Sequence, residues 1–220
     1  MQPFHIAIDG PAGSGKSSIS KELAIKLNCI HIDTGAMYRA VTAIALRKKT
    51  PLEDVETYQF LESSVFEYQH ESIYVNGENL SDVIRDPNIN QHVSLVSSIG
   101  YVRQKLVEVQ QKLAETHDIV MDGRDIGSVV LPNAQVKIFL TAAIEERAKR
   151  RIHEMGLDIP LKTMIEDIQN RDYKDSTRSI SPLTKASDAI VIDTTYLTKE
   201  EVIEVILIEI NKRKRQHAKH

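Results

Sequence analysis

The chain has 220 residues, of which 41% are apolar, and its 28 basic and 31 acidic residues leave a formal charge of −3. This length predicts one large domain with a substantial core, and the balanced charge gives no reason to expect DNA, RNA or an anionic membrane as the main partner. Cys29 is the only cysteine, which excludes an intrachain disulfide and a CxxC metal or redox pair.

The chain carries no signal-peptide pattern and no apolar run of the ~18–20 residues that span a bilayer. We therefore expect a cytoplasmic protein without a membrane or nucleic-acid partner. No heptad pattern is present, so we expect a monomer.

Short apolar runs alternate with helical patterns along most of the chain. We expect strands at Phe4–Asp9, Cys29–Asp33, Asp118–Asp122, Val136–Thr141 and Asp188–Asp193. We expect helices at Ser14–Leu27, Ala36–Lys48, Val102–His117, Ile144–Glu154, Leu161–Asp172 and Thr198–Lys212. Continuously apolar strands separated by helices predict a parallel sheet in a three-layer α/β domain.

One stretch, residues 65–100, breaks this alternation. It opens with a period-two pattern, and Asn76-Gly77 lies between two strand-like runs. Asn-Gly is a strong hairpin signal because both residues tolerate positive φ. We therefore expect an inserted subdomain with its own small antiparallel sheet.

A phosphate-binding loop follows the first predicted strand. Residues 10–17 fit GxxxxGK[ST] at every fixed position, between a strand and a helix. The backbone N–H groups and the helix N-terminus favour phosphate, Lys16 can reach the β- and γ-phosphates, and the Ser17 hydroxyl can ligate Mg²⁺. Asp9 and Asp122 end two strands beside this loop, where they can hold the ion directly or through water. These features predict nucleotide binding.

Arginines gather in three places along the chain, which suits phosphoryl transfer between two polyanions. They are Arg39; Arg103 with Arg124; and Arg147, Arg150, Arg151, Arg171 and Arg178. The planar guanidinium matches phosphate oxygens and can stabilise charge on a moving phosphoryl group. No NKxD-type base-reading motif of a regulatory GTPase is present.

Three further segments resemble the bacterial cytidylate kinases. Asp33-Thr-Gly-Ala-Met-Tyr-Arg39 resembles their D-[ST]-G-x-x-Y-R segment, and Asp122-Gly-Arg-Asp-Ile-Gly127 resembles their DGRDxGT segment. Arg171-Asp-x-x-Asp-x-x-Arg178 is similar to the RDxxDxxR stretch of their lid. With the phosphate loop these segments follow the family's order, and the resemblance covers nearly the whole chain, including the insert. Thr34 and Ser128 replace Ser and Thr of many members, and each keeps the hydroxyl.

The resemblance implies a role for each matching residue. Gly10, Pro11, Ala12, Gly13, Ser14, Gly15, Lys16, Ser17 and Ser18 would bind ATP. Arg39 and Arg124 would hold the acceptor phosphate; Ser94, Arg103 and Asp125 would contact cytosine; Thr34 and Tyr38 would line the same pocket. Arg171, Asp175 and Arg178 would reach the acceptor when the lid closes, and Arg147 and Arg151 would face the transferring phosphoryl group. Lys16, Arg124, Arg147 and Arg151 would thus be the catalytic residues.

The chemistry of cytosine supports the same pocket. Its pairing edge offers an amino donor at N4 and acceptors at N3 and O2, which one carboxylate and one guanidinium complement, as in Asp125 and Arg103. Uracil would instead place a carbonyl against the carboxylate. No catalytic base is needed, because the acceptor phosphate oxygen is already anionic near neutral pH.

These observations predict a P-loop kinase that transfers a phosphoryl group from MgATP to CMP or dCMP. Its parts would be a core (1–64, 101–145 and 180–220), an acceptor-binding insert (65–100) and a helical lid (146–179). Two alternatives stay open: a kinase of another small acceptor such as UMP or shikimate, and a nucleotide-dependent module that binds RNA through the basic tail after Lys212.

Overall fold

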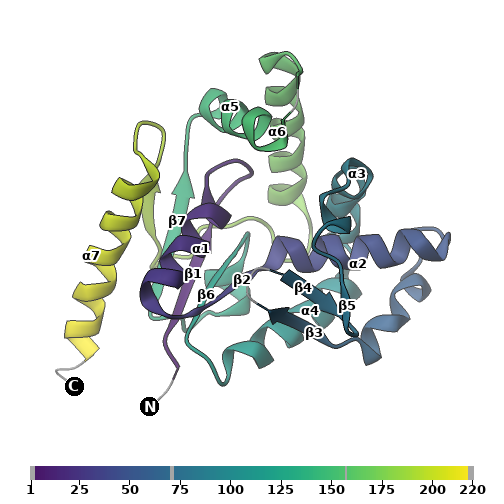
Figure 1. Ribbon diagram of the computed structural model, residues 1–220, viewed down its shortest axis with the longest axis horizontal. Helices are drawn as coiled ribbons and strands as arrows, with labels where there is room; N and C mark the ends of the chain where they lie inside the picture. Colours follow the sequence, from purple (N-terminus) through teal and green to yellow (C-terminus); the bar gives the residue numbers. More distant parts are fainter. Residues whose placement is uncertain (1–2, 70–71, 157, 218–220) are drawn as a thin grey trace.

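The computed structural model describes residues 3–69, 72–156 and 158–217, and a parallel sheet forms its centre. The strands β2 (Ile30–Asp33), β6 (Ile119–Gly123), β1 (His5–Asp9), β7 (Val136–Thr141) and β8 (Ile190–Asp193) lie in that order, and every pairing is parallel. The sequence pattern predicted all five strands. The carboxyl ends of all five therefore meet at one edge of the sheet (Figure 1).

Helices cover both faces of the sheet, which confirms the predicted three-layer α/β fold. α1 (Lys16–Leu27) and α7 (Lys199–His217) pack on one face, and α2 (Thr34–Lys48) and α4 (Gly100–Ala114) on the other. Successive residues of β1 divide between the two sides, since Ile6 and Ile8 join the core under α1 and α7 while Ala7 joins the core under α2 and α4. Burial on both faces explains the continuous apolar runs of the strands.

The insert contains the predicted antiparallel sheet, formed by β3 (Phe66–Gln69), β4 (Ser72–Val75) and β5 (Glu78–Asn79). Asn76 and Gly77 link β4 to β5 with φ values of 52° and 80°, as an Asn-Gly hairpin requires. The 3₁₀ helix η2 (Val83–Arg85) and the helix α3 (Pro87–Val96) complete the insert, and the sequence pattern had not predicted either. Its apolar side chains, such as Ile73 and Val93, share one core with α2 and α4.

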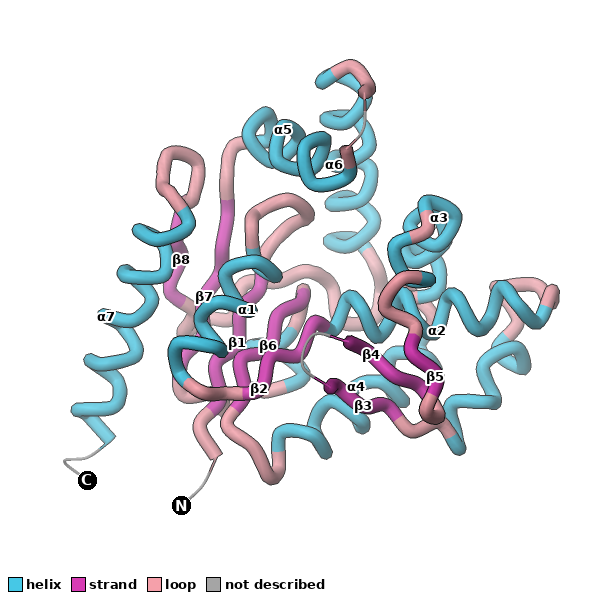
Figure 2. Tube along the Cα trace, in the orientation of Figure 1, coloured by secondary structure: helices cyan, strands magenta, loops and turns pink. Residues whose placement is uncertain are grey.

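The helices α5 (Ile144–Met155) and α6 (Leu161–Thr177) stand above the carboxyl edge of the sheet (Figure 2). They hold a small core of their own, built on Ala148, Met164 and Ile168. The prediction ended α6 at Asp172, which is wrong, because the helix continues to Thr177 and includes Asp175.

Two irregular segments were not predicted from the sequence. The 3₁₀ helix η1 (Val55–Ser63) leads from α2 toward the insert, and the π-helical turn η3 (Ile126–Val130) follows β6. The end of the basic tail, residues 218–220, lies outside the described residues.

Candidate active site

The phosphate loop joins β1 to α1, and two of its glycines are required by geometry. Gly10 and Gly13 have φ values of 152° and 74°, which L-residues rarely adopt. A Cβ at Gly10 would collide with the carbonyl of Leu140, and one at Gly13 would lie 2.8 Å from the carbonyl oxygen of Arg147. The loop therefore passes too close to β7 and α5 for any side chain at these two positions.

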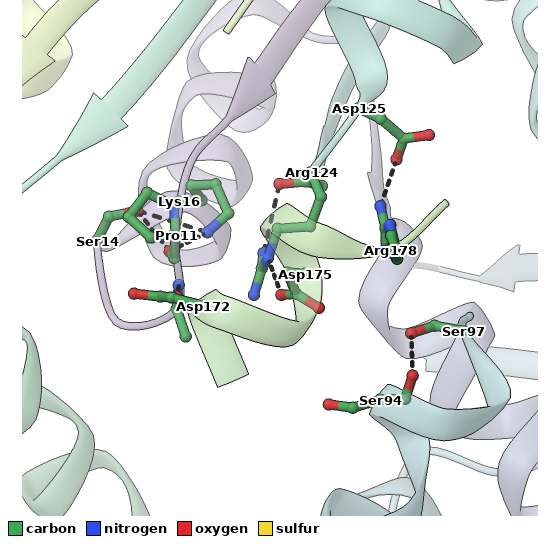
Figure 3. Close-up of polar contacts among 12 residues, drawn as sticks. Pro11, Ser14, Lys16, Ser94, Ser97, Arg124, Asp125, Asp172, Asp175 and Arg178 are labelled. Carbon is green, nitrogen blue, oxygen red and sulfur yellow. Dashed lines mark hydrogen bonds and ion pairs between the residues drawn. The ribbon is translucent and has the colours of Figure 1, made fainter. Parts of the chain in front are cut away.

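Lys16 is buried at the start of α1, with 6% of its surface exposed. Its Nζ donates to the carbonyl oxygen of Pro11 at 2.7 Å and lies 3.4 Å from Ser14 Oγ (Figure 3). Burial, and then the positive charge of Arg124, hold the pKa of Lys16 well below its usual value. An anion bound beside Lys16 would offset both the burial of its charge and the repulsion from Arg124.

Asp122 is the centre of a polar network beside the loop. Its Oδ2 accepts a hydrogen bond from Ser17 Oγ at 2.7 Å, and its Oδ1 lies 2.8 Å from His31 Nε2. Burial alone would lower the pKa of His31, but the hydrogen bond and charge of Asp122 outweigh it and raise that pKa. Reasoning from the sequence missed His31, because a lone histidine in a strand carries no motif signal.

A hydroxyl and a carboxylate oxygen side by side are the hard donors that Mg²⁺ prefers. Within the described ranges no group of three or more His, Cys, Asp or Glu side chains could hold a metal ion. Mg²⁺ in nucleotide enzymes is typically held by one or two protein oxygens together with substrate phosphates, so Ser17 and Asp122 fit this ion.

Asp9 is engaged differently from Asp122. Its Oδ1 accepts from the backbone N–H of Ile126 and its Oδ2 from that of Gly127, each at 2.8 Å. Burial outweighs these bonds and raises the pKa of Asp9 to about 6. The carboxylate thus holds the first two N–H groups of the π-helical turn, a role that its place at a strand end did not predict.

A buried ion pair joins two of the residues predicted to contact cytosine. Arg103 Nη2 donates to Asp125 Oδ2 at 2.5 Å, and the two side chains are 3% and 6% exposed. The Arg103 guanidinium also lies over the Tyr38 ring, 5.3 Å from its centroid. Arg178 Nη2 lies 3.6 Å from the other oxygen of Asp125. The structure therefore brings together four residues that are far apart in the sequence.

The other predicted acceptor residues surround this pair. Arg39 Nη2 donates to Asp33 Oδ2 at 2.9 Å, and the Thr34 hydroxyl donates to the Asp122 carbonyl at 2.8 Å. Ser94 lies in α3, where its carbonyl accepts from Ser97 Oγ at 3.1 Å (Figure 3). No hydrogen bond from the Ser94 hydroxyl has been identified within the described chain, so its side chain is the least tied to this network.

The helix α6, part of the predicted lid, carries the predicted residues Arg171 and Asp175, and Asp175 contacts Arg124. Arg124 Nε donates to Asp175 Oδ2 at 2.8 Å (Figure 3). Burial and the neighbouring charge of Arg124 lower the pKa of Arg171 to about 10. Burial alone would raise the pKa of Asp175, but Arg124 and Arg171 outweigh it and hold that pKa below its usual value.

Asp172 joins α6 to the phosphate loop. Its Oδ1 accepts from the N–H of Ala12 at 3.2 Å, and its Oδ2 accepts from Arg147 Nη1 at 2.5 Å. Arg147 also donates to the carbonyl of Ala12 at 3.0 Å. The motif that contains Asp172 was recognised but this residue was not singled out, although it lies three positions before Asp175 on the same helix face. Arg151, by contrast, is paired with the exposed Glu154 at 3.0 Å.

Unpaired buried polar atoms concentrate among the predicted acceptor residues. Within the described residues, five buried side-chain nitrogen or oxygen atoms have no hydrogen-bond partner, and four of them are Tyr38 Oη, Arg103 Nε, Arg171 Nε and Arg178 Nη2. Leaving such groups unpaired costs free energy, so their clustering marks a place built to meet polar ligand atoms.

A cavity of about 220 Å³ opens on the other side of the phosphate loop, against Gly15 and Ser18. Arg150 forms part of its wall and donates to Thr194 twice, at 2.9 Å to Oγ1 and 2.6 Å to the carbonyl. Arg150 was noted in the sequence only as one of the clustered arginines, and the loop at Thr194 carried no motif.

Comparison with known proteins identifies the family. The family model described as cytidylate kinase matches residues 6–212. The chain belongs to the cytidylate kinase family. Its relatives include the cytidylate kinase of Acholeplasma laidlawii, 52% identical over 210 residues that cover 94% of this chain and 95% of that protein. The cytidylate kinase of Ligilactobacillus salivarius is 48% identical over 221 residues, covering 97% and 99%. This membership confirms the resemblance and the prediction of a kinase.

A more distant likeness concerns the fold of this cytidylate kinase family member. A gluconokinase from Sinorhizobium meliloti superimposes with a TM-score of 0.51 at 14% identity, covering 99% of this chain and 97% of that one. It supports the kinase fold alone.

Among the helices that the structure describes, none combines the length and apolar character of a membrane span.

Proposed function

We propose that this protein transfers the γ-phosphoryl group of MgATP to the phosphate of CMP or dCMP, giving ADP and CDP or dCDP. Family membership supports the reaction. The observation that carries the acceptor assignment is the buried Arg103–Asp125 pair, with Arg124 on the same turn of chain and unpaired polar atoms around it. We further propose that the protein acts as a cytoplasmic monomer.

ATP would bind along Gly10–Ser18, with its phosphates on the loop N–H groups and on Lys16. Its nucleoside would extend toward the cavity beside Gly15 and Arg150, since that cavity adjoins the loop. Ser17 and Asp122 would hold Mg²⁺. Asp9 would lie near the ion. The bound ion would supply positive charge that offsets the negative charge developing on the transferring phosphoryl group.

The acceptor nucleotide would lie between the core and the insert. Asp125 and Arg103 complement the N4, N3 and O2 edge of cytosine, and Thr34, Tyr38 and Ser94 line the pocket. Arg39 and Arg124 would take the acceptor phosphate. A site of this kind rejects uracil strongly, because a mismatched edge leaves buried polar groups unpaired.

The transferring phosphoryl group would be met by cations of the loop and the lid. Lys16, Arg124, Arg147 and Arg151 would stabilise its charge, and Arg171, Asp175 and Arg178 would contact the acceptor as the lid closes. We take residues 146–179 as this lid, 65–100 as the insert and 1–64, 101–145 and 180–220 as the core. Closure would exclude water, which would otherwise consume the γ-phosphoryl group by hydrolysis.

An ADP-release assay with MgATP and CMP, dCMP, UMP, AMP or GMP tests the proposal. We expect strong turnover with CMP and dCMP and little with the other three. Turnover with none of them would overturn the acceptor site. If UMP were the best acceptor, or if shikimate supplied in place of a nucleotide were phosphorylated, the alternative kinase would be supported instead.

Asp125→Ala separates the acceptor pocket from the ATP site. We expect calorimetry to show a loss of CMP affinity of at least about tenfold, with affinity for a non-hydrolysable ATP analogue unchanged, because the carboxylate of Asp125 meets Arg103 and Arg178, which are not residues of the phosphate loop. Glu204→Ala, which removes an exposed carboxylate on α7, is the control and should change neither affinity. An equal loss of both affinities would show the pocket assignment to be wrong.

Deletion of the basic tail tests the RNA-binding alternative. Removing residues 213–220 should leave kinase activity intact if the basic tail has no part in function. A salt-sensitive RNA affinity that disappears with the tail would support the alternative.

A further inference from the structure

The last residue of β1 lies between the two substrate sites. Asp9 precedes Gly10 of the phosphate loop and is in register with Gly123 of β6, which directly precedes Arg124. Its side chain is 3% exposed. Asp9 is therefore next to the phosphate loop along the chain, and next to the segment that carries Arg124 and Asp125 in the sheet.

Both oxygens of Asp9 are used to hold that segment. They accept hydrogen bonds from Ile126 and Gly127, the first two residues of the π-helical turn. The first N–H groups of any helix lack partners inside the helix, so an acceptor from outside must supply them. π-helical turns are rare and are often found at functional sites. Asp9 supplies the acceptors for this one.

The turn begins directly after the residue that reads the acceptor. Asp125 precedes Ile126, and its carbonyl accepts from Val129 at 2.9 Å and Val130 at 3.2 Å within the turn. Its carboxylate meets Arg103 and Arg178. Any rotation of the turn would therefore move the Asp125 carboxylate away from these two arginines.

We propose that Asp9 is a positioning residue that anchors the turn Ile126–Val130 and so sets the place of Asp125 and Arg124 relative to the phosphate loop. The proposal rests on the proposed function and deepens it, because the anchor would align the acceptor with ATP. It differs from the prediction that Asp9 helps to hold Mg²⁺. Asp122 is the carboxylate that contacts Ser17, whereas both Asp9 oxygens face backbone N–H groups.

Asp9→Asn tests the anchor with little change of shape. The amide keeps one acceptor oxygen but turns its NH₂ group toward the second backbone N–H, so one of the two bonds is lost. We expect CMP affinity, measured by calorimetry with EDTA and without ATP, to fall about tenfold or more. The affinity for a metal-free ATP analogue and the Mg²⁺ concentration at half-maximal velocity should change less than twofold.

Two further variants provide the comparison. Asp122→Asn, the matched carboxylate, should raise the Mg²⁺ concentration at half-maximal velocity while it affects CMP affinity in EDTA less. Asp9→Glu keeps the charge but displaces the oxygens by one methylene, so it should weaken CMP binding as Asp9→Asn does. A normal CMP affinity with a raised Mg²⁺ requirement in Asp9→Asn would overturn the proposal in favour of metal binding. Unchanged values throughout would overturn it as well.

A measurement on the unaltered protein covers the event that the variants fail to fold. The amide protons of Ile126 and Gly127 should exchange with solvent much more slowly than that of Gly77 in the exposed turn between β4 and β5. Rapid exchange at both positions would refute the anchor. The two proposals fail on different results. The proposed function fails if the unaltered protein does not phosphorylate CMP, whereas the anchor fails on the variants and on amide exchange.

Discussion

Replacing Arg103 with methionine should destabilise the folded protein, because the change leaves Asp125 buried without its main partner. The two side chains are 3% and 6% exposed and 2.5 Å apart. Removing one member of such a pair costs about 3–5 kcal/mol. Arg178 stays 3.6 Å from the other oxygen of Asp125 and compensates in part. We therefore expect a loss of about 3 kcal/mol, which is about 6–12 °C in Tm for a chain of this size.

Urea and thermal unfolding followed by circular dichroism measure this loss, and the chain offers a matched control. Arg47 pairs with Glu78 at 2.7 Å, but the two side chains are 46% and 55% exposed. Arg47→Met should cost less than about 1 kcal/mol, because solvent screens an exposed pair. Each variant removes one arginine–carboxylate pair, and the two pairs differ in burial. The difference between the two losses of unfolding free energy therefore measures the effect of burial.

A double-mutant cycle completes the test. Arg103→Met combined with Asp125→Asn removes both charges, so the double variant should be more stable than the sum of the single effects predicts by about 1–3 kcal/mol. The explanation by a buried charge would be refuted if Arg103→Met destabilised no more than Arg47→Met, or if the two pocket changes were simply additive.

Three further predictions concern the site. Arg39→Met should lower kcat/KM for CMP about a hundredfold and leave the affinity for an ATP analogue unchanged, since a charged hydrogen bond to the acceptor phosphate is lost. Steady-state kinetics measures the first quantity and calorimetry the second, and an equal loss of both would contradict the prediction. Arg150→Met should weaken binding of the ATP analogue but not of CMP, because Arg150 lines the cavity beside Gly15 of the phosphate loop; the opposite result in calorimetry would contradict it. Burial raises the pKa of Asp9 from 3.8 to about 6, so the folded protein binds this proton more tightly than the unfolded chain does. The stabilisation contributed by protonated Asp9 is therefore complete below about pH 4 and is lost as the pH rises toward 6. Urea unfolding should show that the wild type loses about 3 kcal/mol of unfolding free energy relative to Asp9→Asn between pH 4 and 7. A gain of the wild type relative to Asp9→Asn over this range would contradict the prediction.

Local patterns predicted the fold well where one physical cause dominates. Continuous apolar runs predicted the five buried strands, and Asn76-Gly77 predicted the β4–β5 hairpin, because only a few residues tolerate its backbone angles. The π-helical turn Ile126–Val130 could not be predicted in this way. Its first N–H groups are satisfied by Asp9, a residue more than a hundred positions away.

The site was predicted by residue type but not by pairing. The sequence indicated that arginines would gather around two phosphates. It placed Arg103 and Asp125 in one pocket, but it contained no indication that these two side chains pair with each other, that Arg124 pairs with Asp175, or that Arg147 pairs with Asp172. These pairs join segments whose proximity follows from the folded sheet and the lid, so no local pattern records them.

The length of α6 shows how the two kinds of information meet. Its inner face carries Met164 and Ile168 in the lid core, then continues at Asp172 and Asp175 along the same face. An apolar periodicity ends at Ile168, and for that reason the predicted helix was too short. The helix continues because its face changes from apolar packing to ionic contacts with Arg147 and Arg124. One helix face thus packs against α5 and pairs with two arginines, so a change in the packing of α5 and α6 should also change the placement of these charges.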